Sequence, residues 1–438
     1  MKFKKLCSLM LVTSILAASL AGCGSKTNDP VDTMEVDAET LKGDIELMLP
    51  AGDYIDYVKK SILPYFNKEY PNINVTVSDD KNIDTRIAAG DAPTLYAGTW
   101  GAPPIKYAKM DKLVNFDNFK DYSALAERID SKYLGKVLDG TYYVPLNANT
   151  QMMIYNKELF KEAGLDPEKP PVTFDEYLTY AKKISELPNR KDGSKTYGTT
   201  FWNDALAWGG WYWTMLAQEY YNMNGGKYQL LNELGTDVVF DKPEANMDKF
   251  FKFSQDAQNF APPTMEKNFF SRSVGMWSQF GYGWKANLKQ ALDTPMEIGK
   301  DVGIAPIPVL NAGDKSISTI DGRALMIFKT DKEKETMAFE LVKFLMRDKE
   351  NLDSCKALGQ LPTLKSLATD PYFQTPENKP FLDLLETGVP NEGFAESDEI
   401  QNIILQTYEK VVIKKSLTPE QGVKEAAEKS RKILSTAK

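Results

Sequence analysis

The residues of this sequence best suited to binding chemistry are its large aromatic side chains. All seven tryptophans lie between Trp100 and Trp284, and four of them fall between Trp202 and Trp213. Tyrosine and tryptophan combine a flat face with a polar tip, which suits the half-exposed wall of a binding site. Several residues of this cluster also follow the spacing of one helix face, so packing in a core is the alternative for each of them.

A second aromatic group follows an apolar run from Ser273 to Trp277, which is predicted to be a strand. Glycines then alternate with aromatic residues up to Trp284, and glycine permits the tight turns that present rings on a loop. Packing at the start of a helix near Lys285 is the structural alternative. The candidate aromatic platforms are Trp100, Trp202, Trp208, Trp213, Tyr282 and Trp284.

The sequence contains no histidine, which excludes His-based triads, His general bases and His metal sites. It also lacks a G-x-S-x-G motif and metal-ligand spacings, so we expect neither an enzyme nor a metal or cofactor site. The net charge is −8, and no basic stripe is present. A nucleic-acid partner is therefore not expected.

The N-terminus predicts the compartment. Three lysines among the first five residues precede an apolar run from Leu6 to Leu20, which is typical of a secretory signal peptide. The Leu-Ala-Gly-Cys that ends at Cys23 resembles a bacterial lipobox, so residues 1–22 are predicted to be a lipoprotein signal peptide and Cys23 the lipidated (palmitate-bearing) residue. Two acyl chains there would anchor the protein at the extracellular face of the cell membrane. Residues 23–42 are polar and aperiodic and are expected to form a flexible tether.

Strands and helices alternate in the part of the chain that follows. Ile45 to Leu49, Ile73 to Val77 and Pro93 to Gly98 have strand patterns, with helical segments between them. This order predicts βαβ crossovers and a mostly parallel sheet. At 438 residues the chain is expected to form two domains. Ligands of such sheets collect beyond the carboxyl ends of the strands.

The stretch from Tyr142 to Leu187 predicts a strand, a polar crossing and a second strand, followed by helices. Thr173 and Glu176 form a capping box, in which each side chain satisfies an amide of the first helical turn. A further capping box is predicted at Thr330 with Glu333. The last helix is predicted to begin at Thr418, with Pro419 at its first position and Gln421 three residues on. Cys355 would be the one thiol left beside Cys23, so no intramolecular disulfide is possible and burial as a small hydrophobe is expected.

This stretch resembles a known family. Val144-Pro145, Ile154 to Leu165 and Thr173 to Glu176 are similar to a characteristic block of the family 1 extracellular solute-binding proteins. These are the substrate-capturing lipoproteins of ABC importers, similar to the maltose-binding protein. Later segments match in the same order: Gly275 to Trp277, Gly303 to Pro308, Asp321 to Ala324, Ala338 to Leu345 and Leu361 to Thr363. Arg323 departs from the pattern, because the family often has a glycine pair there.

The resemblance implies an α/β, two-lobed periplasmic-binding-protein-like fold of type II, with a cleft between lobes that hinge crossovers join. The N-lobe would hold residues 43–146 and 305–358, and the C-lobe residues 147–304 and 359–438. Asn147 to Thr150 would be a crossover facing the cleft, and the lobes would close on a ligand. The implied partners are the transmembrane subunits of an ABC permease, and the protein is expected to act as a monomer.

The favoured ligand is a carbohydrate, and an oligosaccharide is expected. A sugar ring has apolar faces and a polar rim, so its site needs flat aromatic residues together with amides and carboxylates. Asn149, Asp321 and Arg323 are the candidate partners of the rim. Asp53 and Phe394 are added because they match a strand-end position and a C-terminal position of the family.

Two other functions stay open. The same transport role could serve a non-sugar solute, either polar or held as a cation by cation–π contacts. A secreted glycosidase would need two carboxylates about 5–10 Å apart, and the sequence cannot show such a pair. Nothing in the chain matches a hydrolase motif, so the glycosidase is the least favoured of the three.

Overall fold

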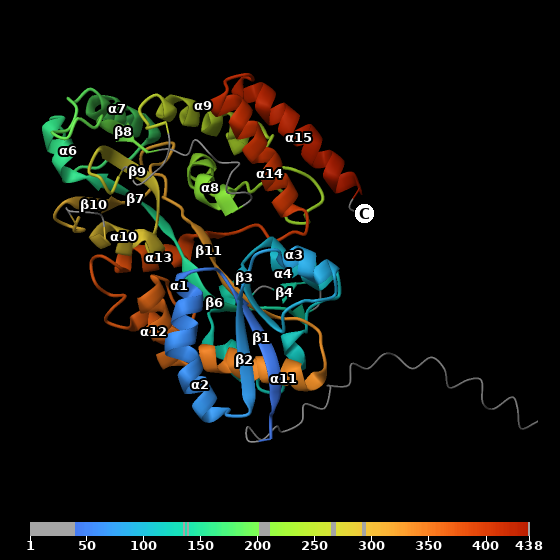
Figure 1. The fold of residues 1–438 in the computed structure, drawn as a ribbon. Helices are drawn as coiled ribbons and strands as arrows, with labels where there is room; N and C mark the ends of the chain where they lie inside the picture. The colour runs from blue at the N-terminus through green and yellow to red at the C-terminus, as the bar shows by residue number, and fades with distance from the viewer. Residues whose placement is uncertain are drawn as a thin grey trace, which may run out of the picture.

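The protein is described by a computed structural model, in which two α/β lobes lie one above the other (Figure 1). The structure describes residues 40–134, 136–137, 140–200, 211–263, 269–290 and 295–436. The predicted signal peptide, the lipidation site Cys23 and most of the predicted tether lie outside these residues.

The lower lobe contains a six-stranded sheet in the order β12-β11-β3-β1-β2, with β6 also paired to β11. Its strands are β1 (Gly43–Leu49), β2 (Ile73–Asp79), β3 (Leu95–Thr99), β6 (Val144–Asn149), β11 (Thr319–Ile327) and β12 (Val389–Pro390). The strands β1, β2 and β3 are parallel, as predicted. The sheet as a whole is mixed, because β11 enters it from the other lobe and runs antiparallel to both β3 and β6.

The upper lobe contains a four-stranded sheet in the order β10-β7-β9-β8. Its strands are β7 (Gln151–Asn156), β8 (Tyr197–Thr199), β9 (Val274–Gly281) and β10 (Val302–Ala305). Every residue of β7 and β9 is buried, which is expected of strands covered on both faces. A small ribbon, β4 (Lys136–Val137) with β5 (Gly140–Thr141), accompanies the lower lobe.

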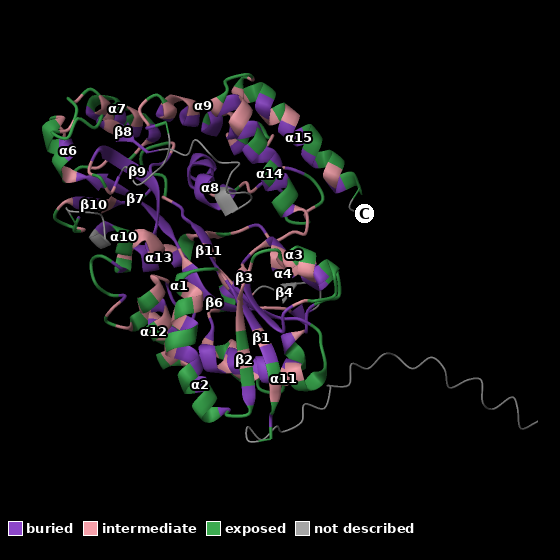
Figure 2. Ribbon diagram, viewed as in Figure 1, coloured by how far each residue is buried: buried purple, intermediate pink, exposed green. Residues whose placement is uncertain are grey.

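Helices cover both sheets and turn their buried sides inward (Figure 2). The lower lobe has α1 (Asp53–Tyr57), α2 (Leu63–Glu69), α3 (Ile83–Ala88), α4 (Ala102–Lys109), α5 (Tyr122–Arg128), α11 (Lys332–Leu345) and α12 (Asp348–Leu358). The upper lobe has α6 (Lys157–Glu162), α7 (Phe174–Ser185), α8 (Trp211–Asn224), α9 (Met247–Gln258), α10 (Lys285–Gln290), α14 (Ser397–Tyr408) and α15 (Pro419–Thr436). The remaining helix α13 (Lys379–Thr387) lies where the lobes meet.

One of the two predicted capping boxes is confirmed, and a second box stands at Thr418, where the last helix was predicted to begin. Thr173 accepts a hydrogen bond from the amide of Glu176, whose carboxylate accepts one from the amide of Thr173. Thr418 and Gln421 exchange the same two hydrogen bonds. The box predicted at Thr330 and Glu333 is wrong.

The cap of α11 lies one residue further along the chain. Asp331 is the N-cap and accepts from the amide of Lys334 at 2.9 Å. The amide of Thr330 donates instead to the carboxylate of Glu335. An aspartate caps a helix as well as a threonine does, so the neighbouring carboxylate displaces the hydroxyl from this role.

Within the described residues, the chain passes between the lobes at three places. It leaves the lower sheet after Asn149 and enters the upper sheet at Gln151. It returns between Ala305, which pairs with Met153 of β7, and Thr319, where β11 begins. It crosses again after β12. Ala305, the first residue of the expected N-lobe segment 305–358, is therefore still the last residue of an upper-lobe strand. Residues 389–390, which were expected to belong to the C-lobe, pair with β11 of the lower sheet.

The expectation about the remaining thiol can be compared with this fold. Cys355 is buried in α12, as predicted, and burial raises the pKa of its thiol to about 12. Among the helices in the described part of the chain, none is long and apolar enough to cross a membrane.

Candidate ligand-binding site

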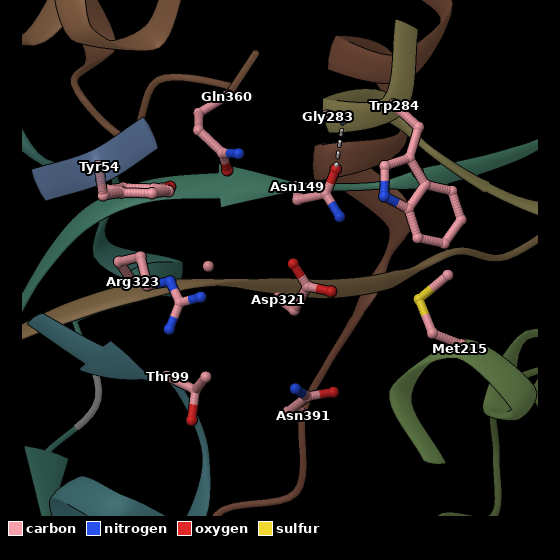
Figure 3. A pocket seen from close by; sticks show the side chains of 12 residues that line it. Tyr54, Thr99, Asn149, Met215, Gly283, Trp284, Asp321, Arg323, Gln360 and Asn391 are labelled. Carbon is pink, nitrogen blue, oxygen red and sulfur yellow. Dashed lines mark hydrogen bonds between the residues drawn. The ribbon is translucent and has the colours of Figure 1, made fainter. Parts of the chain in front are cut away.

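A cavity of about 150 Å³ lies between the two lobes (Figure 3). Its lining comes from both sheets and from the segments that join them: Tyr54, Thr99, Asn149, Met215, Gly281, Gly283, Trp284, Asp321, Gly322, Arg323, Gln360 and Asn391. One water needs only about 10–15 Å³ of such space, so the cavity has room for a small organic ligand. A concave site with a few convergent polar groups is typical of ligand binding.

The polar wall is built by strand pairing. Asp321 of β11 lies opposite Asn149 of β6, and Arg323 lies opposite Thr99 of β3. Side chains two residues apart on a strand share one face, so Asp321 and Arg323 both reach the cavity. Figure 3 shows these two side chains pointing into the same space, with Asn149 above Asp321.

The wall on the upper-lobe side is more apolar. Trp284 stacks on Trp277, with ring centroids 4.7 Å apart and an interplanar angle of 24°. This stacking fixes the indole plane at the cavity edge, next to Met215 from α8. A side chain at Gly281 would start 3.3 Å from Nδ2 of Asn149, so the glycine keeps this amide accessible. The amide of Gly283 donates to Oδ1 of Asn149 at 3.4 Å.

Asp321 has a perturbed acidity. Burial raises the pKa of its carboxyl group to about 6, although a hydrogen bond from Asn149 and the charge of Arg323 act in the opposite direction. The carboxylate is therefore the major form at neutral pH. It can accept hydrogen bonds from hydroxyl groups of a ligand in a site with little water.

Arg323 supplies the donors on the same wall. Its guanidinium lies 5.6 Å from the ring centroid of Tyr54. None of the ion pairs found among the described residues includes Arg323. Burial raises the pKa of the nearby Asp80, and the charge of Arg323 opposes this rise. A planar guanidinium can donate to two ligand oxygens at once.

The structure brings four of the residues predicted from the sequence into one cavity: Asn149, Trp284, Asp321 and Arg323. Asp53 is exposed in the first turn of α1, beside the lining residue Tyr54. Phe394 is half-buried against Gly235. Neither Asp53 nor Phe394 lines the cavity, and Trp202 and Trp208 lie outside the described residues.

Three other predicted platforms are core residues. Trp100 is 5% exposed, and its indole Nε1 donates to the carbonyl of Arg323 at 2.8 Å. Trp213 packs edge-on against Phe250 at 6.0 Å, and Tyr282 packs against Phe381 at 5.4 Å. Their rings fill hydrophobic space behind the walls, so they do not line the cavity.

Five lining side chains were not predicted: Tyr54, Thr99, Met215, Gln360 and Asn391. Thr99 could have been found, because it ends a strand of a sheet whose ligands collect at strand ends. Tyr54 is next in sequence to the predicted Asp53. Met215, Gln360 and Asn391 carry no local signal, because tertiary folding alone brings their segments to the cleft.

No cluster of His, Cys, Asp and Glu suited to a metal ion is present in the residues that the structure describes. Two lobes joined by three crossings, with a polar and aromatic cavity between them, define a solute-binding protein of the periplasmic type. The chain belongs to the family of bacterial extracellular solute-binding proteins, whose sequence model matches residues 51–351. The resemblance seen in the sequence is thereby confirmed.

The individual proteins that resemble this chain share only a small part of its sequence. The sn-glycerol-3-phosphate-binding periplasmic protein UgpB of Escherichia coli K12 is 24% identical over 410 residues, which cover 85% of this chain and 88% of UgpB. The cyclic alpha-maltosyl-1,6-maltose binding protein from Arthrobacter globiformis superposes with a TM-score of 0.73 at 18% identity, covering 90% of this chain and all of that one. A solute-binding protein from Thermotoga lettingae bound to alpha-D-tagatose has a TM-score of 0.74 at 20% identity, with the same coverage. These structures confirm the two-lobed α/β fold.

Membership of the family establishes the general role. This is a solute-binding protein of ABC transport, a class that binds small-molecule ligands and ABC permeases and whose members work outside the cytoplasm. The family is one of transport proteins rather than of enzymes.

Proposed function

We propose that the protein captures a carbohydrate in the cleft between its lobes and delivers it to an ABC permease. The observation that carries the proposal is the placement of Asp321 and Arg323 on one wall, across the cavity from Trp284. A carboxylate and a guanidinium match the hydroxyl rim of a sugar, and an indole matches its apolar face. The relatives whose ligands are named bind polyhydroxylated compounds, which supports the same chemistry here.

Calorimetry against a ligand panel tests this proposal. The panel holds D-tagatose, maltose, longer malto-oligosaccharides, sn-glycerol 3-phosphate and spermidine. Binding of at least one neutral sugar is expected, and we expect oligosaccharides to bind best. Binding of spermidine alone would overturn the carbohydrate proposal. Release of shorter sugars from the oligosaccharides would instead revive the glycosidase alternative.

One observation favours a second ligand class. Arg323 faces the cavity without an ion pair among the described residues, so a phosphorylated polyol could bind its guanidinium bidentately. The same charge disfavours a cationic solute. If sn-glycerol 3-phosphate binds more tightly than every neutral sugar of the panel, the anionic class replaces the neutral one.

We further propose that the protein is a monomer tethered to the extracellular face of the cell membrane through lipidated Cys23. Replacing this residue, as Cys23→Ser, is expected to abolish incorporation of labelled palmitate and to release the protein into the soluble extracellular fraction. The parent chain expressed alongside is the control. If the Cys23→Ser protein stays in the membrane fraction and keeps the label, the anchor proposal is wrong.

A further inference from the structure

One face of helix α8 carries a row of buried polar side chains. Thr214, Gln218 and Asn222 follow one another at intervals of four residues, so they stack along one side of the helix. Their exposed fractions are 4%, 0% and 2%. Buried polar groups are costly unless they are hydrogen-bonded, so the partners of this row show its role.

The partners are in the chain segment that crosses from the upper lobe into β11. The side-chain amide of Asn222 accepts from the N–H of Ile317 at 2.8 Å and donates to the carbonyl of the same residue at 2.7 Å. Gln218 accepts from the N–H of Thr319 at 2.9 Å and donates to the hydroxyl of Thr319. β12 pairs with this segment at Thr319, and the two side-chain amides satisfy the backbone groups of Ile317 and Thr319 that face α8.

The other two crossings are joined to the same segment. Gln151, the first residue of β7, donates its N–H to the hydroxyl of Ser318 at 2.8 Å. Val389, at the start of β12, donates its N–H to the carbonyl of Ser318 at 2.8 Å. The hydroxyl of Thr214 donates to Oδ1 of Asn391 at 3.3 Å. All three passages between the lobes therefore meet beside α8.

The ligand cavity begins immediately beyond these contacts. Asp321 follows Thr319 by two residues on β11, and Asn391 is itself a lining residue. Met215, also on α8, contributes to the same wall. Within β11 the backbone at Gly322 is tightly packed, because a Cβ there would lie 2.1 Å from the carbonyl oxygen of Asn147. The segments between α8 and the cavity are therefore short and tightly packed, so a shift of α8 would also move the residues that line the cavity.

We propose that Gln218 and Asn222 are positioning residues for the binding site. They hold residues 317–319 on the upper lobe, and in this way they set the orientation of Asp321 and Asn391 and the angle between the lobes. Neither residue lines the cavity. The effect on affinity rests on the proposed carbohydrate function, whereas the effect on the lobe angle does not.

The same helix offers a matched control. Asn224 is also a buried amide that binds backbone carbonyls, those of Tyr228 at 3.1 Å and Ala245 at 3.4 Å. Its partners belong to the upper lobe and not to a crossing. Asn222→Leu and Asn224→Leu therefore each remove one buried side-chain amide. Only Asn222→Leu removes hydrogen bonds to a segment that crosses between the lobes.

The experiment measures the distance between the lobes without ligand. Spin labels are placed at the exposed positions Asn67 and Lys249, as Asn67→Cys and Lys249→Cys, in the full chain carrying Cys7→Ser and Cys23→Ser. Pulsed dipolar spectroscopy then records the distance distribution. The remaining thiol, Cys355, is buried. Calorimetry with D-tagatose and maltose gives the affinity, and thermal unfolding gives the stability.

Asn222→Leu and Gln218→Met are expected to shift or broaden the distance distribution and to weaken sugar binding by about tenfold or more. Asn224→Leu is expected to lower the unfolding temperature to a similar degree while keeping the parent distribution and affinity. If Asn222→Leu does not fold, Gln218→Met decides. Unchanged distances in the crossing variants, or equal changes in the control, would overturn the proposal. An absence of sugar binding in the parent protein would count against the carbohydrate function alone.

Discussion

At the scale of single residues, the cavity depends on how its surroundings change the acidity of Asp321. Burial favours the protonated form of Asp321, and the neighbouring guanidinium opposes this by favouring the carboxylate. The resulting pKa of Asp321 is about 6. A group that titrates there can make ligand binding depend on pH.

We predict that affinity for a neutral sugar falls as the pH is lowered through 6. Below that value the pKa of Asp321 leaves the carboxyl mainly protonated in the empty site, so it loses acceptor capacity for sugar hydroxyls. Calorimetry between pH 5 and pH 8 measures the effect. Asp321→Asn should bind more weakly and with a flatter pH profile. An unchanged pH profile in this variant would show that another group titrates.

A second prediction concerns the indole at the cavity edge. Trp284→Ala removes the flat surface that is held by stacking on Trp277. Sugar affinity should fall at least tenfold, or about 1.4 kcal/mol. The exposed Tyr65 of α2 lies outside the cavity, so Tyr65→Ala is the control and should bind normally. Parent-like affinity of Trp284→Ala would remove this residue from the site.

At the scale of elements, strand and helix ends determine where side chains of the site lie. The cavity lining collects where β3, β6 and β9 end and where β11 begins. Helix caps fix the neighbouring segments by satisfying amides that have no partner within the helix. The capping box of α7 is one such fixed end, and it starts the helix with which the family block ends.

Removing this cap should destabilise the upper lobe without changing the affinity for the ligand. Thr173→Ala leaves the amide of Glu176 without its side-chain acceptor, which costs about 1 kcal/mol. Urea unfolding measures the loss. Thr179, exposed on the same helix, donates only to the carbonyl of Asp175. Thr179→Ala is therefore the control, and an equal loss in both variants would argue against the capping role.

At the scale of the whole molecule, buried acids connect stability to pH. Glu219 of α8 is fully buried and accepts hydrogen bonds from Ser278 at 2.6 Å and Gln279 at 3.0 Å. Burial raises the pKa of its carboxyl group to about 7. Between about pH 4.5 and pH 7, the carboxyl group of Glu219 therefore holds a proton in the folded state that it has released in the unfolded chain.

The sign of the pH effect follows from this difference. Because the folded state binds more protons between about pH 4.5 and 7, the free energy of unfolding falls as the pH rises through that range. The contribution of Glu219 is on the order of 1–3 kcal/mol. Urea unfolding at pH 5 and pH 8 should show a smaller difference for Glu219→Gln than for the parent. An undiminished difference would assign the pH dependence to other groups.

The sequence by itself determined the elements, the family and part of the site. Strand alternation, the capping box at Thr173, the helix start at Thr418, and the polar interruption between β6 and β7 depend on neighbours within a few residues, so they can be read locally. Asn149 was found because it falls in such an interruption, whereas Asp321 and Arg323 were found in a segment that matches the family. The box at Thr330 was misplaced because a competing carboxylate stands next to it.

Only the tertiary structure decided which aromatic residues face the cleft. Trp213 and Trp284 were both predicted to be binding platforms, yet one packs against Phe250 in the core and the other reaches the cavity. The hydrogen-bonding row on α8 was equally hidden, because its partners lie about a hundred residues away along the chain. Contacts over such separations depend on how the lobes pack, and sequence spacing carries no record of that packing.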